Sequence, residues 1–505
     1  MVGPAMAGQY NEPMALPIAV YSAAQVRALD QRAIESLPVS GYTLMKRAGE
    51  AALRYLRARW PMSTRIVIVC GGGNNGGDGY VLARFAQAAG LEVSVIAALP
   101  VAGLKGDARQ AHADFAASGG AVRPLSTSLL REGEVIVDAV FGTGLRAAVR
   151  SAGADAIRAI NAAGRPIFAL DIPSGLDADS GMPLGEAVRA DSTVTFVGLK
   201  TGLFLGEGPE RAGGIFFDDL EVPVPDIPQF SPRLQRITEA CVVQALPRRP
   251  RQAHKGDFGH VLIIGGGIGM PGAARLCGEA CLRTGAGLVT VATAPENLIA
   301  IVAGRPELIC LPLHSPAELV SALERADIVA IGPGLGRSAW SQELVRLTLA
   351  CDKPLVVDAD ALNIIAEAGK RQRDNWILTP HPGEAARLLG IETAEVQADR
   401  LAALAALVRD YGGTIALKGA GTLVGRSGKA PGLCERGNPG MASAGMGDVL
   451  TGAIAGVLAQ CADPWLATRA AVMAHAQAGD AAARPGERGL LASDVARELQ
   501  ACVNP

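Results

Sequence analysis

Short runs of β-branched and aliphatic residues alternate with alanine-rich helical segments along almost the whole chain. Strands that alternate with helices in this way are typical of parallel sheets covered by helices. The pattern therefore predicts an α/β fold. The strands expected in the first half are Arg65–Cys70, Glu92–Ala97, Val135–Val140, Pro166–Leu170 and Ser192–Val197. Those expected in the second half include His260–Ile264, Leu288–Ala292, Ile328–Ile331, Pro354–Val357, Trp376–Leu378 and Thr414–Leu417.

A proline-rich segment separates the two halves. The window from Val222 to Pro232 contains four prolines, which cannot continue a helix or a central strand. We therefore place a boundary near residues 225 to 237. At about 150 residues per domain, a chain of 505 residues is also too long for one core. Two domains are expected, over residues 16–225 and 237–503.

Composition narrows the class of protein. Hydrophobic residues make up 49% of the chain and charged residues 19%, so large cores can form. The formal net charge of -2 gives no reason to expect nucleic-acid binding, and the strand-sized apolar runs predict no membrane span. Residues 1–15 lack the basic start and apolar core of a signal peptide, so a cytoplasmic enzyme is expected. Cys277 and Cys281, at helical spacing, are expected to pack in a core rather than bind metal.

A glycine-rich loop follows the first predicted strand. Residues 71–79 read Gly-Gly-Gly-Asn-Asn-Gly-Gly-Asp-Gly, and a helix is expected from about Tyr80 to Ala89. The glycines match the dinucleotide-binding spacing, but the next strand ends at Ala97 without the carboxylate that holds a ribose. This disfavours an NAD-dependent dehydrogenase. The loop also carries more side-chain oxygen than a phosphate cradle requires, although asparagine and aspartate occur in tight turns for conformational reasons alone.

Two further strands of the first half end in aspartate. Asp138 precedes Phe141-Gly142-Thr143-Gly144, and Asp171 precedes Pro173-Ser174-Gly175. Ligands of open α/β sheets bind at the carboxyl ends of the strands. Asn75, Asp138 and Ser174 could therefore hold a hard cation, while Asp78 or Asp171 could face a substrate. Such aspartates often only cap helices, but three such loops together favour a site.

The first half resembles the YjeF N-terminal family, the epimerases of hydrated NADH and NADPH. The resemblance covers roughly Ile18 to Val224, and its most specific motif is Gly-Asn-Asn-Gly-Gly-Asp-Gly. It implies a Rossmann-like three-layer sandwich and a potassium ion near Asn75, Asp138 and Ser174. Asp171 is the first catalytic candidate and Asp78 the second; the sequence does not distinguish them. The substrate contacts implied are Asn74, Asn75, Gly76, Gly77, Asp78, Gly142, Thr143, Gly144, Leu145, Arg146, Ala147, Ala148 and Asp171, with no separate role for Arg146.

The second half contains a candidate phosphoryl-transfer site. The stretch from Asn438 to Asp448 is rich in glycine and small residues and leads into an apolar helix. Backbone N–H groups and the helix dipole would stabilise an anion there, and Asp448 could take a proton from a hydroxyl that attacks a phosphoryl group. Lys418-Gly419-Ala420-Gly421-Thr422, which follows the strand Thr414–Leu417, is a plausible cradle for nucleotide phosphates.

Other loops of the second half are expected at the same edge of the sheet. Gly267, Gly269 and Gly272 repeat the glycine spacing, again without an acidic residue at the end of the following strand. Asp358 and Asp360 follow a strand and could act in a site or as turn and cap residues. Prolines on both sides of His381 hold its imidazole outside any helix.

Together these loops resemble the ribokinase-like superfamily, and within it the ADP-dependent NAD(P)H-hydrate dehydratases, over roughly Ile237 to Val503. The ordered motifs are Lys-Gly-Asp-Phe-Gly, Gly-Pro-Gly-Leu-Gly, Asp-Ala-Asp-Ala-Leu-Asn, Thr-Pro-His-Pro-Gly-Glu, Lys-Gly-Ala-Gly-Thr and Gly-Met-Gly-Asp. The resemblance implies a ribokinase-like three-layer sandwich. It implies that Ala273, Gly336 and His381 position the hydrated dinucleotide and that Asp448 is catalytic. The nucleotide-binding residues implied are Lys418, Gly419, Ala420, Gly421, Thr422 and Gly447.

The whole chain thus resembles a bifunctional repair family that acts on the hydrates NADHX and NADPHX. The resemblance implies epimerisation of the R and S hydrates, dehydration of the S hydrate with ADP and Mg²⁺ to yield AMP and phosphate, and a homo-oligomer. ATP as donor and the preference between NADHX and NADPHX stay open. One alternative is a small-alcohol kinase for a vitamin or sugar, which would release a stable phosphorylated product. Another makes the first domain a non-catalytic binding module for a protein or RNA partner.

Overall fold

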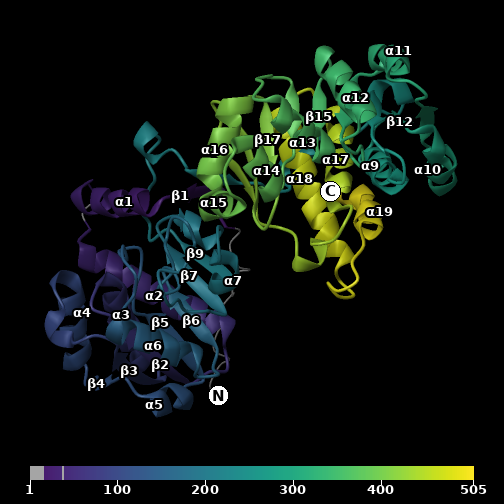
Figure 1. Ribbon diagram of the computed structural model, residues 1–505. Coiled ribbons are helices and arrows are strands. Elements are labelled where there is room, and N and C mark those ends of the chain that lie inside the picture. Colours follow the sequence, from purple (N-terminus) through teal and green to yellow (C-terminus); the bar gives the residue numbers. More distant parts are fainter. Residues whose placement is uncertain (1–15, 37–38, 505) are drawn as a thin grey trace. The chain divides into compact units, whose positions relative to one another are not determined.

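The computed structural model describes residues 16–36 and 39–504. The chain divides into two compact units, unit 1 (Met1–Leu234) and unit 2 (Gln235–Pro505), each built from helices and a sheet (Figure 1). The domain limits 16–225 and 237–503 remain predictions. The expectation about a signal peptide concerns residues 1–15, which lie outside the described residues.

Unit 1 is built around one parallel sheet. The strands of unit 1 are β1 (Ala19–Tyr21), β2 (Arg65–Cys70), β3 (Glu92–Ala97), β4 (Val122–Pro124), β5 (Val135–Ala139), β6 (Ile167–Leu170), β7 (Ser192–Phe196), β8 (Leu199–Lys200) and β9 (Gly214–Asp218). Of these, β1 and β8 form a parallel pair outside this sheet. Its helices are α1 (Ala23–Ser36), α2 (Gly41–Arg59), α3 (Asn74–Ala88), α4 (Gly106–Ala117), α5 (Thr127–Glu132), α6 (Ser151–Asn161) and α7 (Gly208–Ala212). The predicted strands are confirmed to within one residue at each end.

The strand order of this sheet locates the ligand-binding edge. The order is β4-β3-β2-β5-β6-β7-β9, and every neighbouring pair is parallel. The chain moves outward from β2 to β4 on one side and from β5 to β9 on the other. The loops after β2 and β5 therefore diverge at the centre of the sheet, which is where open α/β sheets bind ligands.

Both faces of the sheet of unit 1 are covered. Successive residues of β2 point to opposite faces, so Ile66 and Ile68 belong to one hydrophobic core while Val67 and Val69 belong to another. The first core includes residues of α2 and α3, and the second includes residues of α5 and α6. This three-layer α/β arrangement confirms the predicted fold class for unit 1.

One boundary prediction was wrong. The helix expected from about Tyr80 is α3, which begins at Asn74 after the N-cap Gly73, so most of the predicted glycine loop is helical. The glycines allow close packing of this helix. A Cβ on Gly76 would lie 2.2 Å from the carbonyl oxygen of Gly71, and one on Gly79 would lie 2.8 Å from the Sγ of Cys70. The glycines were read as turn residues, but they bring the first helical turns onto β2.

Unit 2 has a larger, mixed sheet. Its strands are β10 (Leu234–Arg236), β11 (His260–Ile264), β12 (Leu288–Thr293), β13 (Ile309–Pro312), β14 (Ile328–Ile331), β15 (Leu355–Val357), β16 (Trp376–Leu378), β17 (Thr414–Leu417), β18 (Thr422–Arg426) and β19 (Gly432–Cys434). Its helices are α8 (Ala240–Ala245), α9 (Pro271–Arg283), α10 (Leu298–Gly304), α11 (Leu319–Arg325), α12 (Ala339–Ala350), α13 (Ala359–Ala368), α14 (Pro382–Leu389), α15 (Thr393–Ala398), α16 (Arg400–Tyr411), α17 (Met446–Leu458), α18 (Pro464–Ala482) and α19 (Ala492–Cys502).

The sheet of unit 2 also diverges at its centre. Parallel strands follow the order β13-β12-β11-β14-β15-β16-β17, and β18 and β19 add antiparallel pairs beyond β17. The loops after β11, β14, β15, β16 and β17 consequently meet at one edge. The hydrophobic core on one face includes residues of α9, α17, α18 and α19, as well as Cys277 and Cys281, which are buried free thiols. The expected packing of these two cysteines is thereby confirmed.

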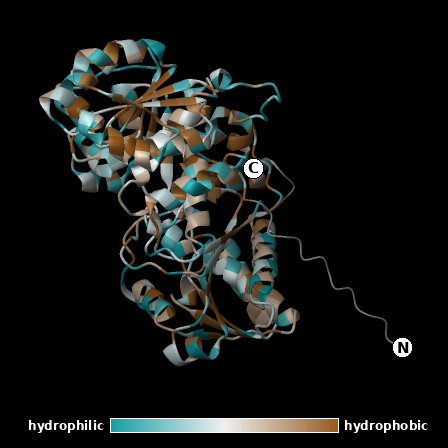
Figure 2. Ribbon diagram, turned by 90° about the vertical axis from the view of Figure 1, so that its right-hand side faces the viewer, coloured by the Kyte–Doolittle hydropathy of each residue, from teal (hydrophilic) through white to brown (hydrophobic). Residues whose placement is uncertain are grey.

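The hydropathy of the elements follows this layering. Figure 2 shows the strands of both units as largely brown ribbons, whereas the helices carry both brown and teal stretches. Brown strands are consistent with sheets buried on both faces. Within the described part of the chain, no helix combines the length and the apolar character needed to cross a membrane.

The contact between α9 and α17 generates a prediction for stability. Replacing Gly452 by alanine would place a Cβ 2.0 Å from the carbonyl oxygen of Cys277, so the two helices must separate. We expect Gly452→Ala to lower the free energy of unfolding of unit 2 by about 1–3 kcal/mol, measured by urea denaturation. Gly272→Ala is the control, since no atom lies within 4 Å of its Cβ position. An unchanged urea midpoint for Gly452→Ala would contradict this packing.

Candidate functional site

A cavity of about 770 Å³ opens at the carboxyl edge of the sheet of unit 1. Most of the predicted site residues line it. Those that do are Asn74, Asn75, Asp78, Gly142, Thr143, Gly144, Leu145, Arg146, Ala147 and Asp171. Gly76 and Gly77 lie in the first turns of α3, where they pack against Gly71 and Met45, and Ala148 is exposed outside the cavity lining. The loops after β2, β5 and β6 thus converge on one cavity.

Asp171 is held by an ion pair that the sequence did not suggest. The Nζ of Lys200 lies 2.5 Å from Oδ1 of Asp171, and Oδ2 of Asp171 accepts a hydrogen bond from the N–H of Thr143 at 3.2 Å. The Lys200 side chain is only 1% exposed and also donates to Thr195 and Phe196. All three protons of this ammonium are therefore bonded, and it forms a buried ion pair with the carboxylate of Asp171.

Asp78 has a different environment. Burial, and secondarily the charge of Asp171, raises the pKa of Asp78 well above its usual range. Asp30, a residue of α1 that also lines the cavity, has its pKa raised to about 6, chiefly by burial. The cavity therefore combines Asp171, which is paired with Lys200, and Asp78, whose protonated form is favoured by burial. Neither Lys200 nor Asp30 was predicted, because neither lies in a recognisable motif.

The residues predicted to hold a cation lie beside this cavity. Asp138 is fully buried and accepts hydrogen bonds from the N–H and Oγ of Ser174 at 2.8 and 2.5 Å. Burial raises the pKa of Asp138 to about 6, although these bonds oppose the shift. Both polar atoms of the Asn75 side chain are buried without a hydrogen-bond partner. An unsatisfied buried amide is costly, so this environment suits a bound ligand or ion.

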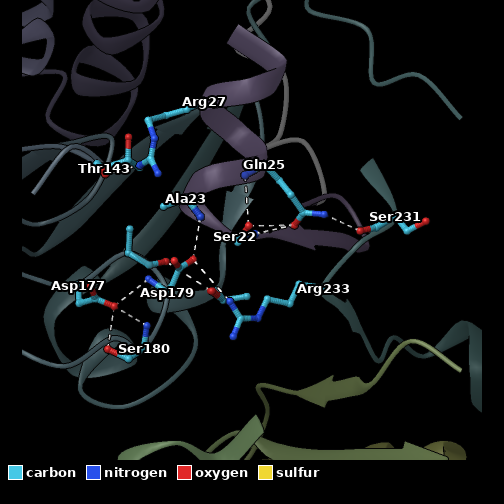
Figure 3. Close-up of polar contacts among 12 residues, drawn as sticks. Ser22, Ala23, Gln25, Arg27, Thr143, Asp177, Asp179, Ser180, Ser231 and Arg233 are labelled. Atoms are coloured by element: carbon cyan, nitrogen blue, oxygen red, sulfur yellow. Dashed lines mark hydrogen bonds and ion pairs between the residues drawn. The ribbon is translucent and has the colours of Figure 1, made fainter. Parts of the chain in front are cut away.

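The loop after β5 is anchored on both sides. Arg27 of α1 donates to the carbonyl oxygen of Thr143 at 2.7 Å, and the N–H of Phe141 donates to the Oγ of Ser174, also at 2.7 Å. Figure 3 shows Arg27 reaching Thr143 from α1, whose first residue Ala23 donates to Asp179. A Cβ on Gly142 would contact both Asp171 and Asn75. Helix α1 and the β6 loop together hold this loop over the cavity.

In unit 2, Asp448 lies in the first turn of α17. The N-cap is Gly445, whose φ of 89° is a conformation that favours glycine. The first N–H groups of a helix have no intrahelical acceptor and carry partial positive charge, so this turn can bind an anion. Burial, and secondarily the charge of Asp358, raises the pKa of Asp448 to about 7. Near neutral pH Asp448 therefore exchanges readily between its acid and base forms.

Asp358 connects four elements beneath this turn. Its buried carboxylate accepts hydrogen bonds from Lys418 at 2.6 Å, Thr379 at 2.8 Å and Thr451 at 2.8 Å. Burial alone would raise the pKa of Asp358, but the Lys418 ammonium and these bonds lower it. Asp358 thus fixes the ends of β16 and β17 and the first turns of α17. The sequence assigned no role to Thr379, which opens the Thr-Pro-His-Pro-Gly-Glu motif, or to Thr451.

Lys418 lies between the carboxylates and the helix N-terminus. Besides its ion pair with Asp358, its Nζ is 3.8 Å from Oε2 of Glu384 and 3.2 Å from the Cβ position of Gly447. Burial opposes its charged form, but Asp358 and Glu384 outweigh that effect and raise the pKa of Lys418. The ammonium therefore stays charged directly behind the turn that carries Asp448.

The remaining predicted residues of unit 2 lie at the same edge. His381 is the N-cap of α14, and its Nδ1 accepts from the N–H of Gly383 at 3.0 Å, while burial lowers its pKa. Asp360 accepts from the N–H of Gly336 at 2.8 Å, so it shapes the loop after β14. Ala273 lies in α9 against Gly334 of the same loop. Gly419, Ala420 and Gly421 lie in the turn between β17 and β18, and Thr422 is the first residue of β18.

Comparisons with known proteins cover both units. A family model described as YjeF-related protein N-terminus matches residues 41–202, and one described as NAD(P)H-hydrate dehydratase matches residues 261–501. The bifunctional NAD(P)H-hydrate repair enzyme of Coxiella burnetii is 47% identical, over 96% of this chain and 99% of that protein. The enzyme of the same description from Escherichia coli is 43% identical, over 98% of this chain and 96% of that protein.

Two solved structures resemble unit 2. A ribokinase-like superfamily protein from Enterococcus faecalis is 31% identical, with a TM-score of 0.50 over 54% of this chain and 96% of that chain. The ADP/ATP-dependent NAD(P)H-hydrate dehydratase from Bacillus subtilis is 31% identical, with a TM-score of 0.48 over 53% of this chain and 97% of that chain. Because the two curated relatives match almost the full length of both chains, this chain belongs to the family of bifunctional NAD(P)H-hydrate repair enzymes.

Proposed function

We propose that this chain repairs hydrated NADH and NADPH, with unit 1 interconverting the R and S hydrates and unit 2 dehydrating the S hydrate with ADP. The position of Asp448 carries the proposal. Asp448 has a carboxyl group with a pKa of about 7 and lies in the first turn of α17, where N–H groups can hold a phosphoryl group. A cytoplasmic location and a homo-oligomeric state stay predictions.

In the dehydration, Asp448 removes the proton from the ring hydroxyl. The oxygen of that hydroxyl attacks the terminal phosphoryl group of ADP, and AMP is released. The N–H groups at the start of α17 stabilise the transferring group, because they point to where its charge develops. Phosphate then leaves with the pair of electrons of its C–O bond, and the neighbouring ring carbon gives up a proton to water, which restores the reduced nicotinamide. Phosphorylation thereby replaces hydroxide, a poor leaving group, with phosphate.

Nucleotide binding is assigned to the segment from Lys418 to Thr422 and to Gly447. Binding of the hydrated dinucleotide is assigned to Ala273, Gly336 and His381. In support, the Nζ of Lys418 lies close to Gly447, and the Gly336 loop is held by Asp360. Magnesium in such sites is bound largely by substrate phosphates, and when bound it neutralises charge on the transferring group. No group of three or more histidine, cysteine or acidic residues in the described chain forms a dedicated metal site, which agrees with such nucleotide-borne binding.

In the epimerisation, Asp171 and Asp78 take opposite roles. Asp171, paired with Lys200, accepts the proton of the ring hydroxyl as the adjacent C–N bond breaks. Asp78, whose pKa burial raises well above its usual range, supplies a proton to the departing nitrogen. Closure on the other face of the resulting carbonyl, with both protons returned, gives the opposite epimer. The sequence alone left these two aspartates equivalent, and the Lys200 ion pair is the reason to separate them.

Potassium fits beside this cavity. Asn75, Asp138 and Ser174 would hold it, since they supply amide, carboxylate and hydroxyl oxygens, and the Asn75 amide is buried without a partner. When bound, the cation would attract the phosphate groups of the substrate and would satisfy the Oδ1 of Asn75. It would also favour the ionised form of Asp138, whose pKa burial raises to about 6.

Asp448→Asn tests the dehydratase. We expect dehydration of acid-hydrated NADH with ADP to fall by about 10²–10⁴-fold, because the proton acceptor is lost. Recovery of the NADH absorbance and release of phosphate are the measurements. Asp494→Asn, in the first turn of α19, is the matched control and should keep full activity. Near-normal dehydration by Asp448→Asn would exclude this base, and a stable phosphorylated product would favour the small-alcohol kinase instead.

Separate variants of Asp171 and Asp78 test the epimerase. We expect each change to asparagine to slow interconversion of the purified epimers by about 10²–10⁴-fold, because each residue moves one proton. Chromatographic separation of the epimers over time gives the rate. Asp155→Asn, at an exposed ion pair on α6, is the control. Undiminished interconversion in the Asp171→Ala, Asp78→Ala double variant would support a non-catalytic binding module.

Asn75→Ala tests the potassium site through stability. Addition of K⁺ should raise the unfolding temperature of unit 1 in the wild type but not in Asn75→Ala, whereas Li⁺ should have little effect on either. Without K⁺ the substitution should be nearly neutral, since it removes an unsatisfied amide. The control is Asn161→Ala, which breaks bonds to Ala187 and Arg189 and should be destabilising with or without K⁺. A K⁺-dependent rise that persists in Asn75→Ala would exclude Asn75 as a ligand.

A further inference from the structure

A buried arginine lies directly beneath the turn assigned to the nucleotide. Arg400 is the first residue of α16 and is only 8% exposed. Its guanidinium donates to the carbonyl oxygens of Leu417 and Lys418, both at 3.1 Å, and to that of Ala420. These acceptors belong to the end of β17 and to the turn that follows it. A Cβ on Gly419 would be 3.1 Å from a guanidinium nitrogen of Arg400. Arg400 therefore lies against the inner side of this turn, and only the backbone of the turn separates it from the outer face.

The charge of Arg400 is not compensated within the described chain. No carboxylate among the described residues forms an ion pair with it, and its Nε is buried without a partner. The adjacent carboxylate of Asp399 is exposed and accepts from the N–H of Ala402. Burial of an unpaired charge is expensive, and a cation at a helix N-terminus also opposes the helix dipole. In agreement with this cost, burial lowers the pKa of Arg400 to about 10.

The turn itself is shaped to face an anion. Its carbonyl oxygens at Lys418 and Ala420 point inward to Arg400. Gly419 and Gly421 have φ angles of 135° and 68°, which only glycine adopts readily. When carbonyl groups of a short turn point to one side, its N–H groups can point to the other, and such a concave set of N–H groups binds phosphate. The outer face, at Gly419 and Ala420, is exposed.

We propose that Arg400 is a positioning residue for the nucleotide, whose phosphates supply the counter-charge that this guanidinium lacks. The proposal rests on nucleotide binding at Lys418–Thr422. Arg400 acts in two ways: it orients the N–H groups of the turn by bonding its carbonyls, and its charge attracts phosphate across the turn. Charge attraction grows with the charge of the ligand, whereas a purely structural clamp would affect charged and uncharged nucleosides alike.

Calorimetric titration of the full chain with ADP and with adenosine tests this inference. We expect Arg400→Met to weaken ADP binding by about tenfold or more, the size of a unit charge at this range, and adenosine binding by less than about twofold. Arg373→Met is the matched control. Arg373 also donates to three backbone carbonyls, at Leu349, Cys351 and Lys353, but lies at the turn before β16. It should lower stability without changing the ratio of the two affinities.

Arg400→Lys keeps the charge and should retain the ADP-to-adenosine ratio within about twofold of the wild type, even though carbonyl bonds are lost. Arg400→Lys also tests the proposal if Arg400→Met does not fold. A marked fall in the ratio of ADP affinity to adenosine affinity in Arg400→Lys would contradict a role for the charge of Arg400. If Arg400→Met weakened the binding of ADP and of adenosine equally, Arg400 would have only a structural role in the turn. A wild-type chain that binds no ADP would overturn nucleotide binding itself, and is a distinct result.

Discussion

Each unit depends on one fully buried carboxylate at the end of a central strand. Asp138 is the penultimate residue of β5 and accepts hydrogen bonds from the N–H and hydroxyl of Ser174. Asp358 follows β15 and accepts hydrogen bonds from Lys418, Thr379 and Thr451. A buried carboxylate is tolerated only when neighbouring groups satisfy it. The loops that surround each aspartate are therefore obliged to converge on it. This requirement brings residues distant in the sequence to one edge of each sheet.

Around these anchors the sites separate carboxyl groups by their environment. In unit 1, Asp171 is paired with Lys200, whereas burial raises the pKa of Asp78 well above its usual range. In unit 2, Lys418 and its hydrogen-bonding neighbours keep the pKa of Asp358 low, while burial raises that of Asp448 to about 7. The same residue type can therefore serve as structural anchor, base or acid. Differences in burial and in the nearest ammonium group decide which of these roles each aspartate can have.

Glycine serves two distinct purposes in these sites. At Gly445, Gly419 and Gly421 a positive φ makes the backbone turn sharply, a conformation that glycine adopts without strain. At Gly76 and Gly452 the missing Cβ instead lets a helix lie against a neighbouring backbone. The two purposes look alike in a sequence. Reading the first glycine-rich segment as a loop, when it is the start of α3, followed from this ambiguity.

Sequence alone determined the fold class, nearly all central strands and the loops that line the two candidate sites. This was possible because buried parallel strands are continuous apolar runs and their carboxyl ends carry the glycine and aspartate motifs. Only the tertiary structure decided the partners of those residues. Lys200 reaches Asp171 from β8, a strand of two residues. Arg400, in α16, lies at least 17 residues before the carbonyl groups that it binds at the Lys418 turn. Such contacts arise from packing between distant segments, and no local pattern of residue types encodes them.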